Sequence, residues 1–204
     1  MEEQIIKTVF SHKHKFEVLL DNGTVSKELL QSWLIQRYQF ELTMVKKDLI
    51  ILEKCPDQQF RQGWIQRVID ADSVGGGLDG WVKLGNAAGV DVTDVSKVLP
   101  GVKTALNLFL DWCINNDWKT VVSGSLSQLN AVNNHRNKFN TWANLYPWID
   151  PGGLEYFIVR FDQVESDSKK CLEFIKNAGL SEEVLTESAN VKRNLMKSLL
   201  DAIY

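Results

Sequence analysis

The chain has 204 residues, of which 44% are hydrophobic and 24% are charged. That length and apolar content suit one compact core and exclude an intrinsically disordered segment. The formal net charge of −3 gives no general attraction to a polyanionic backbone, so we predict no nucleic-acid partner. Any positively charged site must therefore be local.

Membrane and secretory signals are not evident. The longest apolar runs, such as residues 49–52, are far below the roughly 20 residues that a membrane span needs. The first residues, MEEQIIKTVF, contain no apolar signal region. Cys55, Cys113 and Cys171 form no CxxC motif and are typical of small core residues in a reducing compartment. We predict a cytoplasmic protein without membrane association.

The first half of the chain has the pattern of long helices. Apolar residues recur at spacings of three and four, and strand-like alternation is nearly absent. Ser26 is a good helix start, and this helix is predicted to end at Cys55-Pro56. The next helix is predicted from about Gln58 to Asp72.

The second half continues in the same way. After the glycine run 75–77, helices are predicted from near Leu78 and after Pro100-Gly101, the latter ending around residues 115–117. A long helix follows Pro151 and ends near Gly179, and Ser181 begins the last one. The sequence thus predicts one all-α domain over residues 1–204, a bundle of seven or eight helices. Such bundles bind ligands in the core between facing helices.

Ionisable residues occur within these apolar patterns, which is unusual for core-facing positions. A buried charge without a partner costs several kcal/mol, so each must meet a counter-charge or a ligand. They are Arg37, Glu41, Lys47, Asp48, Arg67, His135, Lys138, Tyr156 and Arg160.

Two interpretations of these residues compete. One is internal ion pairing, such as Arg37 with Glu41 one helical turn away. The other is a pocket for a multiply charged anion, which is favoured because the cations in the set outnumber the acids. His135 is the only histidine after residue 14, and a single helical histidine is more often structural than catalytic.

Common catalytic motifs are absent from the sequence. A di-iron bundle requires two Glu-x-x-His motifs, and none occurs. HExxH, GxSxG and phosphate-binding loop motifs are also missing. We predict no metal site and no bound cofactor.

Several segments together resemble the pyrroloquinoline-quinone synthase family of the heme-oxygenase-like superfamily, over nearly the whole chain. CPD followed by WIQR, and YPWI followed by YF and R, are the most specific. The matching segments are QSWLIQRYQF, KKDLIILEKCPD, WIQRVIDAD, GWVKLGNAAGV, VLPGVKTALNLFL, NLYPWIDPGGLEYFIVRF and LLDAIY.

The resemblance implies a seven-helix bundle that oxidises a tricarboxylated aromatic precursor with molecular oxygen, without metal or organic cofactor. It implies an oxygen site at His135, Tyr156 and Arg160, with the hydrogen-bond donors that a developing oxygen anion requires. It also implies a homodimer. Substrate-binding positions carried over or adjacent are His14, Arg37, Glu41, Lys47, Arg67, Ser127, Lys138 and Lys192.

Some positions depart from the family pattern. Ala71 stands where the family has a catalytic histidine, and loss of a general acid or base typically costs about 10²–10⁴ in rate. Glu41 replaces a neutral amide, and Lys138 replaces an arginine. Phe109 replaces a tyrosine and Asn194 an aspartate.

Three functions therefore stay open. The first is a cofactor-free oxidase acting on a quinone-like or related small anion, with oxygen as co-substrate. The second is a non-catalytic protein that binds the quinone or its precursor, which Ala71 favours. The third is a metal-dependent oxygenase using Glu41, Asp70 and His135. A thiaminase-like activity is disfavoured because no cysteine occupies a plausible nucleophile position.

Overall fold

The computed structural model describes residues 13–125 and 131–204. Within these ranges every regular element is helical, which confirms the all-α prediction. None of the described helices combines the length and the apolar character needed to cross a membrane. The α-helices are α2 (Lys15–Asp21), α3 (Lys27–Lys54), α4 (Gln58–Asp72), α5 (Gly77–Ala87), α6 (Pro100–Asn115), α7 (Trp118–Ser123), α8 (Ala131–Leu145), α9 (Glu155–Asn177) and α10 (Glu182–Ile203).

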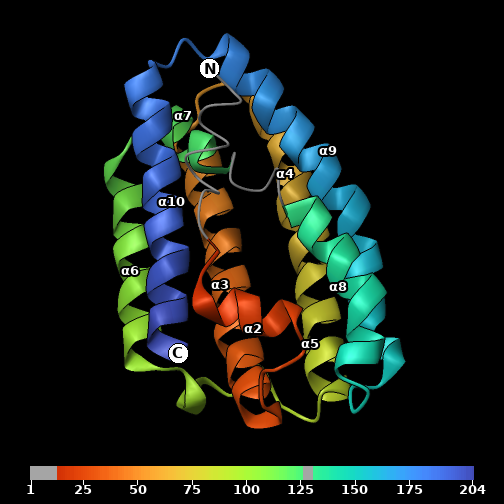
Figure 1. Ribbon diagram of the computed structural model, residues 1–204. Helices are drawn as coiled ribbons and strands as arrows, with labels where there is room; N and C mark the ends of the chain where they lie inside the picture. Colours follow the sequence, from red (N-terminus) through yellow and green to blue (C-terminus); the bar gives the residue numbers. More distant parts are fainter. Residues whose placement is uncertain (1–12, 126–130) are drawn as a thin grey trace.

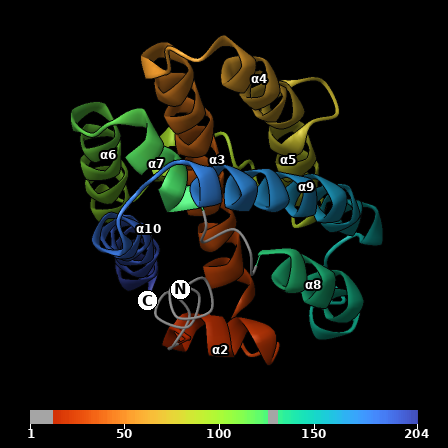
Figure 2. The ribbon, with the colours of Figure 1, turned by 90° about the horizontal axis from the view of Figure 1, so that it is seen from above.

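Helix α3 forms the centre of the bundle. The four consecutive residues 33–36 are all buried, so this helix is covered on every side rather than along one stripe. Seen from above, the other helices surround it, with α6 and α10 on one side and α4 and α5 on another (Figure 2). A side chain that projects from α3 can therefore meet groups from almost any other helix.

The predicted helix starts are confirmed by their capping hydrogen bonds. The Ser26 hydroxyl accepts from the Leu29 N–H at 3.2 Å, and the Asp57 carboxylate accepts from the Phe60 N–H at 3.0 Å. Ser181 caps α10 in the same way. These contacts satisfy N–H groups that the first helical turn leaves without a partner.

Helix α7 was not predicted as a separate element. The residues at 115–117 were interpreted only as the end of α6, but Asp117 also begins a new helix. Its carboxylate accepts from the Lys119 N–H at 2.9 Å, which caps the turn that follows. The segment buries Trp118 and Val121 against the rest of the bundle.

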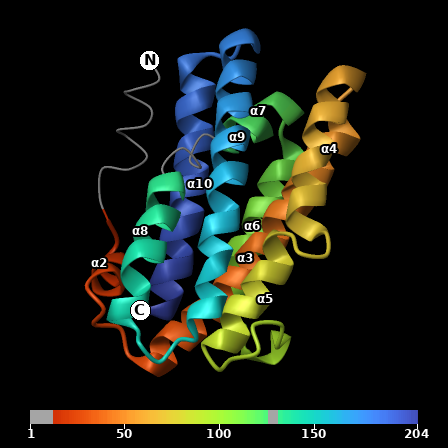
Figure 3. The same ribbon diagram turned by 90° about the vertical axis from the view of Figure 1, so that its right-hand side faces the viewer.

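Two apolar cores lie at opposite ends of α3. One gathers buried residues from α4, α6, α7 and α10 around the second half of α3. The other gathers residues from α2, α5, α8 and the start of α9 around its first half. Figure 1 shows α9 and α10 flanking α3, and Figure 3 shows α2 and α8 on the opposite side of α9 from α4. The middle of α3 is therefore where the two cores meet.

A cluster of buried charges lies on the α4 side of this central helix. Asp48 contacts the ammonium of Lys47 at 2.8 Å and the Arg67 guanidinium at 3.7 Å, and it accepts from the indole N–H of Trp64 at 3.0 Å. Arg67 also reaches Asp167 of α9 at 3.0 Å. Burial raises the pKa of Asp48, but Lys47 and Arg67 outweigh burial and hold it below its ordinary value.

We predict that Asp48→Asn destabilises the protein by about 3–5 kcal/mol, since it leaves buried cations without their carboxylate. Urea denaturation monitored by circular dichroism measures this loss. Because the pKa of Asp48 is lowered by folding, its contribution is present above the ordinary carboxyl pKa and disappears as the pH falls through the lowered value. The wild type and the variant should therefore converge in acid.

The matched control is Glu165→Gln, which removes one partner of the exposed ion pair with Lys169. This change should leave the denaturation midpoint almost unchanged. An Asp48→Asn variant as stable as that control would contradict the assigned role of the buried cluster.

Candidate functional site

A cavity of about 1290 Å³ lies where the two cores meet. Its apolar walls are Trp33, Phe40, Met44, Trp81 and Phe157. Aromatic walls of this kind suit a flat aromatic ligand, because offset and edge-to-face ring contacts are favourable. The volume is in the range of natural small-molecule sites or somewhat above it.

Most of the predicted site residues line this cavity. They come from α2, α3, α8, α9 and α10, which are far apart in the sequence. The lining residues among those predicted are His14, Arg37, Glu41, His135, Lys138, Arg160 and Lys192. Ser127 lies outside the described residues.

Lys47 and Arg67 do not line the cavity. Both are buried, with exposed fractions of 2% and 5%, and the carboxylates they contact are the protein's own Asp48 and Asp167. For these two residues the contacts are those of the internal-pairing interpretation. Both residues therefore lie outside the cavity, and Lys47 is on the same helix as the lining residue Arg37.

His14 is held in place at the mouth of the cavity. Its Nδ1 accepts from the Phe16 N–H at 3.1 Å and so caps α2. Nδ1 therefore carries no proton, and Nε2 donates to Asp201 of α10 at 3.1 Å. His14 thus joins α2 to the end of α10.

The acidic residues of the lining are already engaged by the protein. At the mouth, Asp21 pairs with Lys13 at 2.6 Å and Asp201 pairs with Lys197 at 2.5 Å. These pairs are partly exposed, so they contribute little stability. They do, however, leave neither carboxylate available to a cation deeper in the cavity.

The two remaining acids of the lining are also occupied. Glu17 accepts the backbone N–H of His14 at 3.0 Å, which completes the cap of α2. Glu41 pairs with Arg37 at 2.9 Å, as the alternative of pairing along one helix predicted. Arg37 also lies over the ring of Phe40, 4.0 Å from its centroid.

Besides the exposed Lys15, three more deeply placed basic residues of the lining lack a carboxylate partner among the described residues. Within the described part of the chain, Lys138, Arg160 and Lys192 have no carboxylate at ion-pair distance. Burial lowers the pKa of Lys138 and lowers that of Lys192 further. An anion in the cavity would supply the missing counter-charge, so the site has the electrostatic character of an anion pocket.

His135 is a titratable group that is affected both by burial and by these positive charges. Burial, followed by the charges of Arg160, Lys138 and Arg37, lowers its pKa to about 3. Its Nδ1 is buried and has no hydrogen-bond partner among the described residues. At neutral pH the imidazole is therefore uncharged, with one nitrogen ready for a ligand.

Arg160 and Tyr156 lie beside His135. Nη1 of Arg160 donates to Gln163 at 2.8 Å, while its buried Nε has no partner within the described ranges. The ring of Tyr156 is edge-on to His135 at 5.9 Å, and burial raises the pKa of its hydroxyl well above the ordinary value. Tyr156 does not line the cavity itself, but its ring contacts that of His135.

Ala71 and Arg160 lie near the same glycine. A methyl group placed on Gly77 would lie 3.1 Å from Nη1 of Arg160 and 3.7 Å from the Cα of Ala71. Both residues therefore border this glycine.

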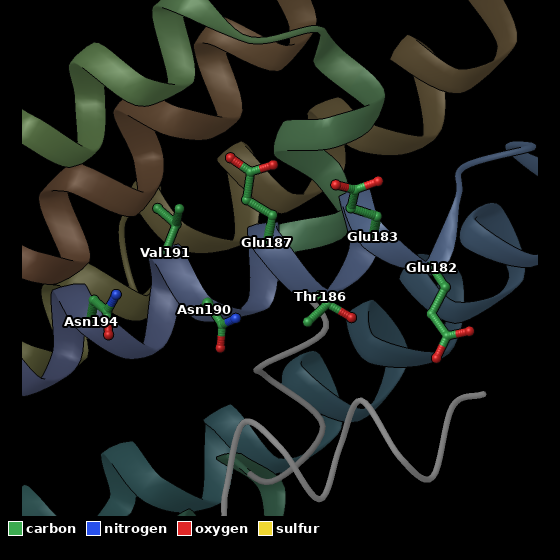
Figure 4. Close-up of a pocket in the computed structure, with 7 residues that line it drawn as sticks. All are labelled: Glu182, Glu183, Thr186, Glu187, Asn190, Val191 and Asn194. Carbon is green, nitrogen blue, oxygen red and sulfur yellow. The ribbon is translucent and has the colours of Figure 1, made fainter.

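A second hollow follows the surface of α10 (Figure 4). Three of its residues are glutamates, so it lacks the positive charge that the main cavity offers to an anion. It is lined by Glu182, Glu183, Thr186, Glu187, Asn190, Val191 and Asn194.

The cysteines are poor nucleophiles. Burial raises the pKa of Cys113 to about 11 and that of Cys171 to about 12, so both stay protonated at neutral pH. Burial also raises the pKa of Cys55. In the described ranges, histidine, cysteine and acidic side chains form no group of three that could hold a metal ion.

Comparison with known proteins places the chain in a family. The model of the TENA/THI-4/PQQC family matches residues 3–200. The chain belongs to this family. The pyrroloquinoline-quinone synthase of Pseudomonas putida is 33% identical over 201 residues, covering 93% of this chain and 79% of the relative. The pyrroloquinoline-quinone synthase of Acinetobacter baumannii is 33% identical over 199 residues, which again cover 93% of this chain and 79% of the relative.

Solved structures confirm the fold that the resemblance implied. A Shewanella denitrificans domain with a heme oxygenase-like fold superposes with a TM-score of 0.74 at 13% identity, covering 99% of this chain and 88% of that one. A TenA homologue of Pseudomonas syringae gives a TM-score of 0.73 at 11% identity, covering 98% and 88%. At these identities the likeness establishes the fold alone.

Sequence reasoning missed the aromatic walls and the cations at the mouth. Trp33, Trp81 and Phe157 were not singled out as site residues, but they are buried in one of the two cores and also line the cavity. Lys13 and Lys197 gave no signal, because an exposed lysine in a sequence resembles any other surface charge. The tryptophans did lie in segments that matched the family.

We predict that His135 in the unliganded protein stays neutral from pH 8 down to pH 5, because its pKa lies near 3. Heteronuclear NMR of the imidazole nitrogens measures this, with His135→Asn to assign the signals. A bound polyanion should raise the pKa, since it opposes the positive charges that lower it. A titration midpoint near the ordinary histidine value without ligand would contradict the prediction.

Proposed function

We propose that this protein is a cofactor-free oxidase that uses molecular oxygen on a polycarboxylated, quinone-like aromatic molecule. The observation that carries the proposal is the excess of basic side chains in an aromatic-walled cavity: Lys138, Arg160 and Lys192 have no carboxylate partner in the described part of the chain. The family membership and the relatives named pyrroloquinoline-quinone synthase support the same substrate class.

The binding role in this proposal falls to the cations. Arg37 and Arg160 have planar guanidinium groups that can hold a carboxylate through two hydrogen bonds, whereas Lys138 provides a point charge. The rings of Trp33 and Phe157 would pack against the flat ligand. Since the site is largely shielded from water, each of these contacts is stronger than on the surface.

The oxidation role falls to His135, Tyr156 and Arg160. Each two-electron step removes two electrons and two protons from the substrate and reduces one O₂ to H₂O₂. The Arg160 guanidinium would stabilise the negative charge that develops on the reduced oxygen. The neutral imidazole of His135 can accept a substrate proton once a bound anion has raised its pKa.

The proposed binding of a quinone is tested by titrating the protein with pyrroloquinoline quinone and measuring the visible absorbance of the quinone. We expect saturable binding, and Lys138→Met should weaken it about tenfold or more, because a hydrogen bond to a charged group is worth about 1.5–3 kcal/mol. The matched control is Lys103→Met at an exposed position of α6, which should bind as the wild type does. Absence of saturable binding, or equal affinity in both variants, would refute the anion site.

Ala71 supports a second candidate, a protein that binds the quinone or its precursor without turning it over. The methyl group of alanine can transfer no proton beside Arg160. Oxygen consumption and peroxide release by metal-free protein with the ring-open tricarboxylated precursor distinguish the two. A binding protein would take up the ligand and consume no oxygen, and restoration of turnover by added iron would instead indicate a metal-dependent enzyme.

We expect Ala71→His to raise the rate of oxygen consumption by about 10²–10⁴, the usual contribution of a general acid or base. The control is Ala71→Gln, which fills similar space without taking part in proton transfer and should leave the rate unchanged. If histidine and glutamine have the same effect, position 71 does not limit the reaction. The homodimer and the cytoplasmic location stay predictions that these experiments do not test.

A further inference from the structure

Lys192 differs from every other lysine of the cavity. It is 6% exposed, lies on the inner face of α10 and lines the cavity. Its amine lies 4.2 Å from the ring centroid of Phe40 and 4.9 Å from that of Phe109, and it contacts the sulfur of Met44. The ring faces of the two phenylalanines and the thioether are weaker partners for an ammonium group than a carboxylate would be.

The charges around Lys192 also disfavour its protonated form. Lys47 and Arg37 of α3 are cations, and they act together with burial to lower the pKa of the amine. Glu41 is the nearby acid of α3, but it is paired with Arg37 at 2.9 Å. Cys113 of α6 cannot serve as a counter-ion, because its pKa of about 11 keeps the thiol neutral.

A second buried lysine, Lys47 of α3, has the contacts that stabilise an ammonium group. Lys47 contacts Asp48 at 2.8 Å and donates to the Ser125 hydroxyl at 2.8 Å. Lys192 has neither kind of contact among the described residues, although it is almost as deeply buried. Burial without a carboxylate partner favours the uncharged form of this amine, and an uncharged amine has the free lone pair of a nucleophile.

We propose that Lys192 is a nucleophile that forms an imine with a carbonyl carbon of an anionic aromatic ligand. The inference rests on the proposed function for the class of ligand, since quinone-like molecules carry such carbonyl groups. The cations Arg37, Lys138 and Arg160 would hold the carboxylates, and the apolar end of the cavity would present the ring carbonyl to Lys192.

The chemistry balances without any further reactant. The nitrogen lone pair attacks the carbonyl carbon, a C–N bond forms, and the C=O π electrons move to oxygen. A proton passes from nitrogen to that oxygen, which gives a carbinolamine. Loss of one water molecule then forms the C=N bond, so no oxidant or reductant is consumed.

Formylbenzoate, an aromatic aldehyde with one carboxylate, is a suitable probe. The protein is incubated with it at pH 7 in the presence of cyanoborohydride, which reduces an imine to a stable secondary amine. Peptide mass spectrometry then gives the rate of labelling at each lysine. The internal control is Lys197, which is on the same helix, also lines the cavity, and forms an ion pair with Asp201 at 2.5 Å.

We expect Lys192 to be labelled at least about tenfold faster than Lys197 at pH 7, in keeping with one pH unit or more of difference in amine protonation. Raising the pH to 9 should speed labelling of Lys197 much more than that of Lys192. Labelling of Lys192 no faster than Lys197, in the wild-type protein, would overturn the proposal. Because this comparison uses no variant, a folding defect cannot obscure it.

Pyrroloquinoline quinone separates this inference from the proposed function. If it binds, it should protect Lys192 from formylbenzoate, and cyanoborohydride should trap it on Lys192 in wild type but not in Lys192→Met. Preferential labelling without protection would support the nucleophile and count against the quinone as ligand. Quinone binding seen by absorbance, with neither labelling nor trapping at Lys192, would overturn the nucleophile and leave the proposed function standing.

Discussion

A charged side chain that leaves water loses hydration worth several kcal/mol, and this bundle buries several such groups around one central helix. On the α4 side of α3 the cost is offset internally, because Asp48 accepts contacts from Lys47, Arg67 and Trp64. On the cavity side the cost of burying charge is not offset internally, because the acids of the lining are all engaged by other groups. The same constraint therefore produces a stabilising cluster on one side of the helix and an incomplete site on the other.

The incomplete side explains the chemistry of the cavity. Burial and neighbouring cations lower the pKa values of His135 and Lys192, so that His135 is neutral at pH 7 and the uncharged form of Lys192 is favoured. A polycarboxylated ligand would reverse part of that effect, since it brings the negative charge that the protein lacks there. Binding and proton transfer are thus coupled, and the imidazole becomes an effective base only when substrate is present. The apolar end near Phe40 and Phe109 is the exception, where an amine can stay neutral and react with carbon.

Much of the fold follows from local signals, whereas the pairing of charges does not. The limits of α4 and the starts of α3 and α10 were predictable, because the capping bonds of Asp57, Ser26 and Ser181 span only two or three residues. The resemblance to the family pointed to His135, Tyr156 and Arg160 together. The partner of Arg67 was not predictable, since Asp167 is a hundred positions away and no local pattern connects them. For that reason Lys47 and Arg67 could not be told apart from the lining cations Arg37 and Lys138 before the helices were packed.

The central claim is that the cavity keeps basic groups neutral until an anion arrives. Calorimetry with trimesate, a benzene ring with three carboxylates and no carbonyl for Lys192 to attack, tests it most directly. Titrations at pH 7.5 in buffers of different ionisation enthalpy give the number of protons that accompany binding. The account predicts net proton uptake from the buffer, reduced in His135→Asn. Binding without proton uptake would show that the cationic groups were charged beforehand, and would contradict it.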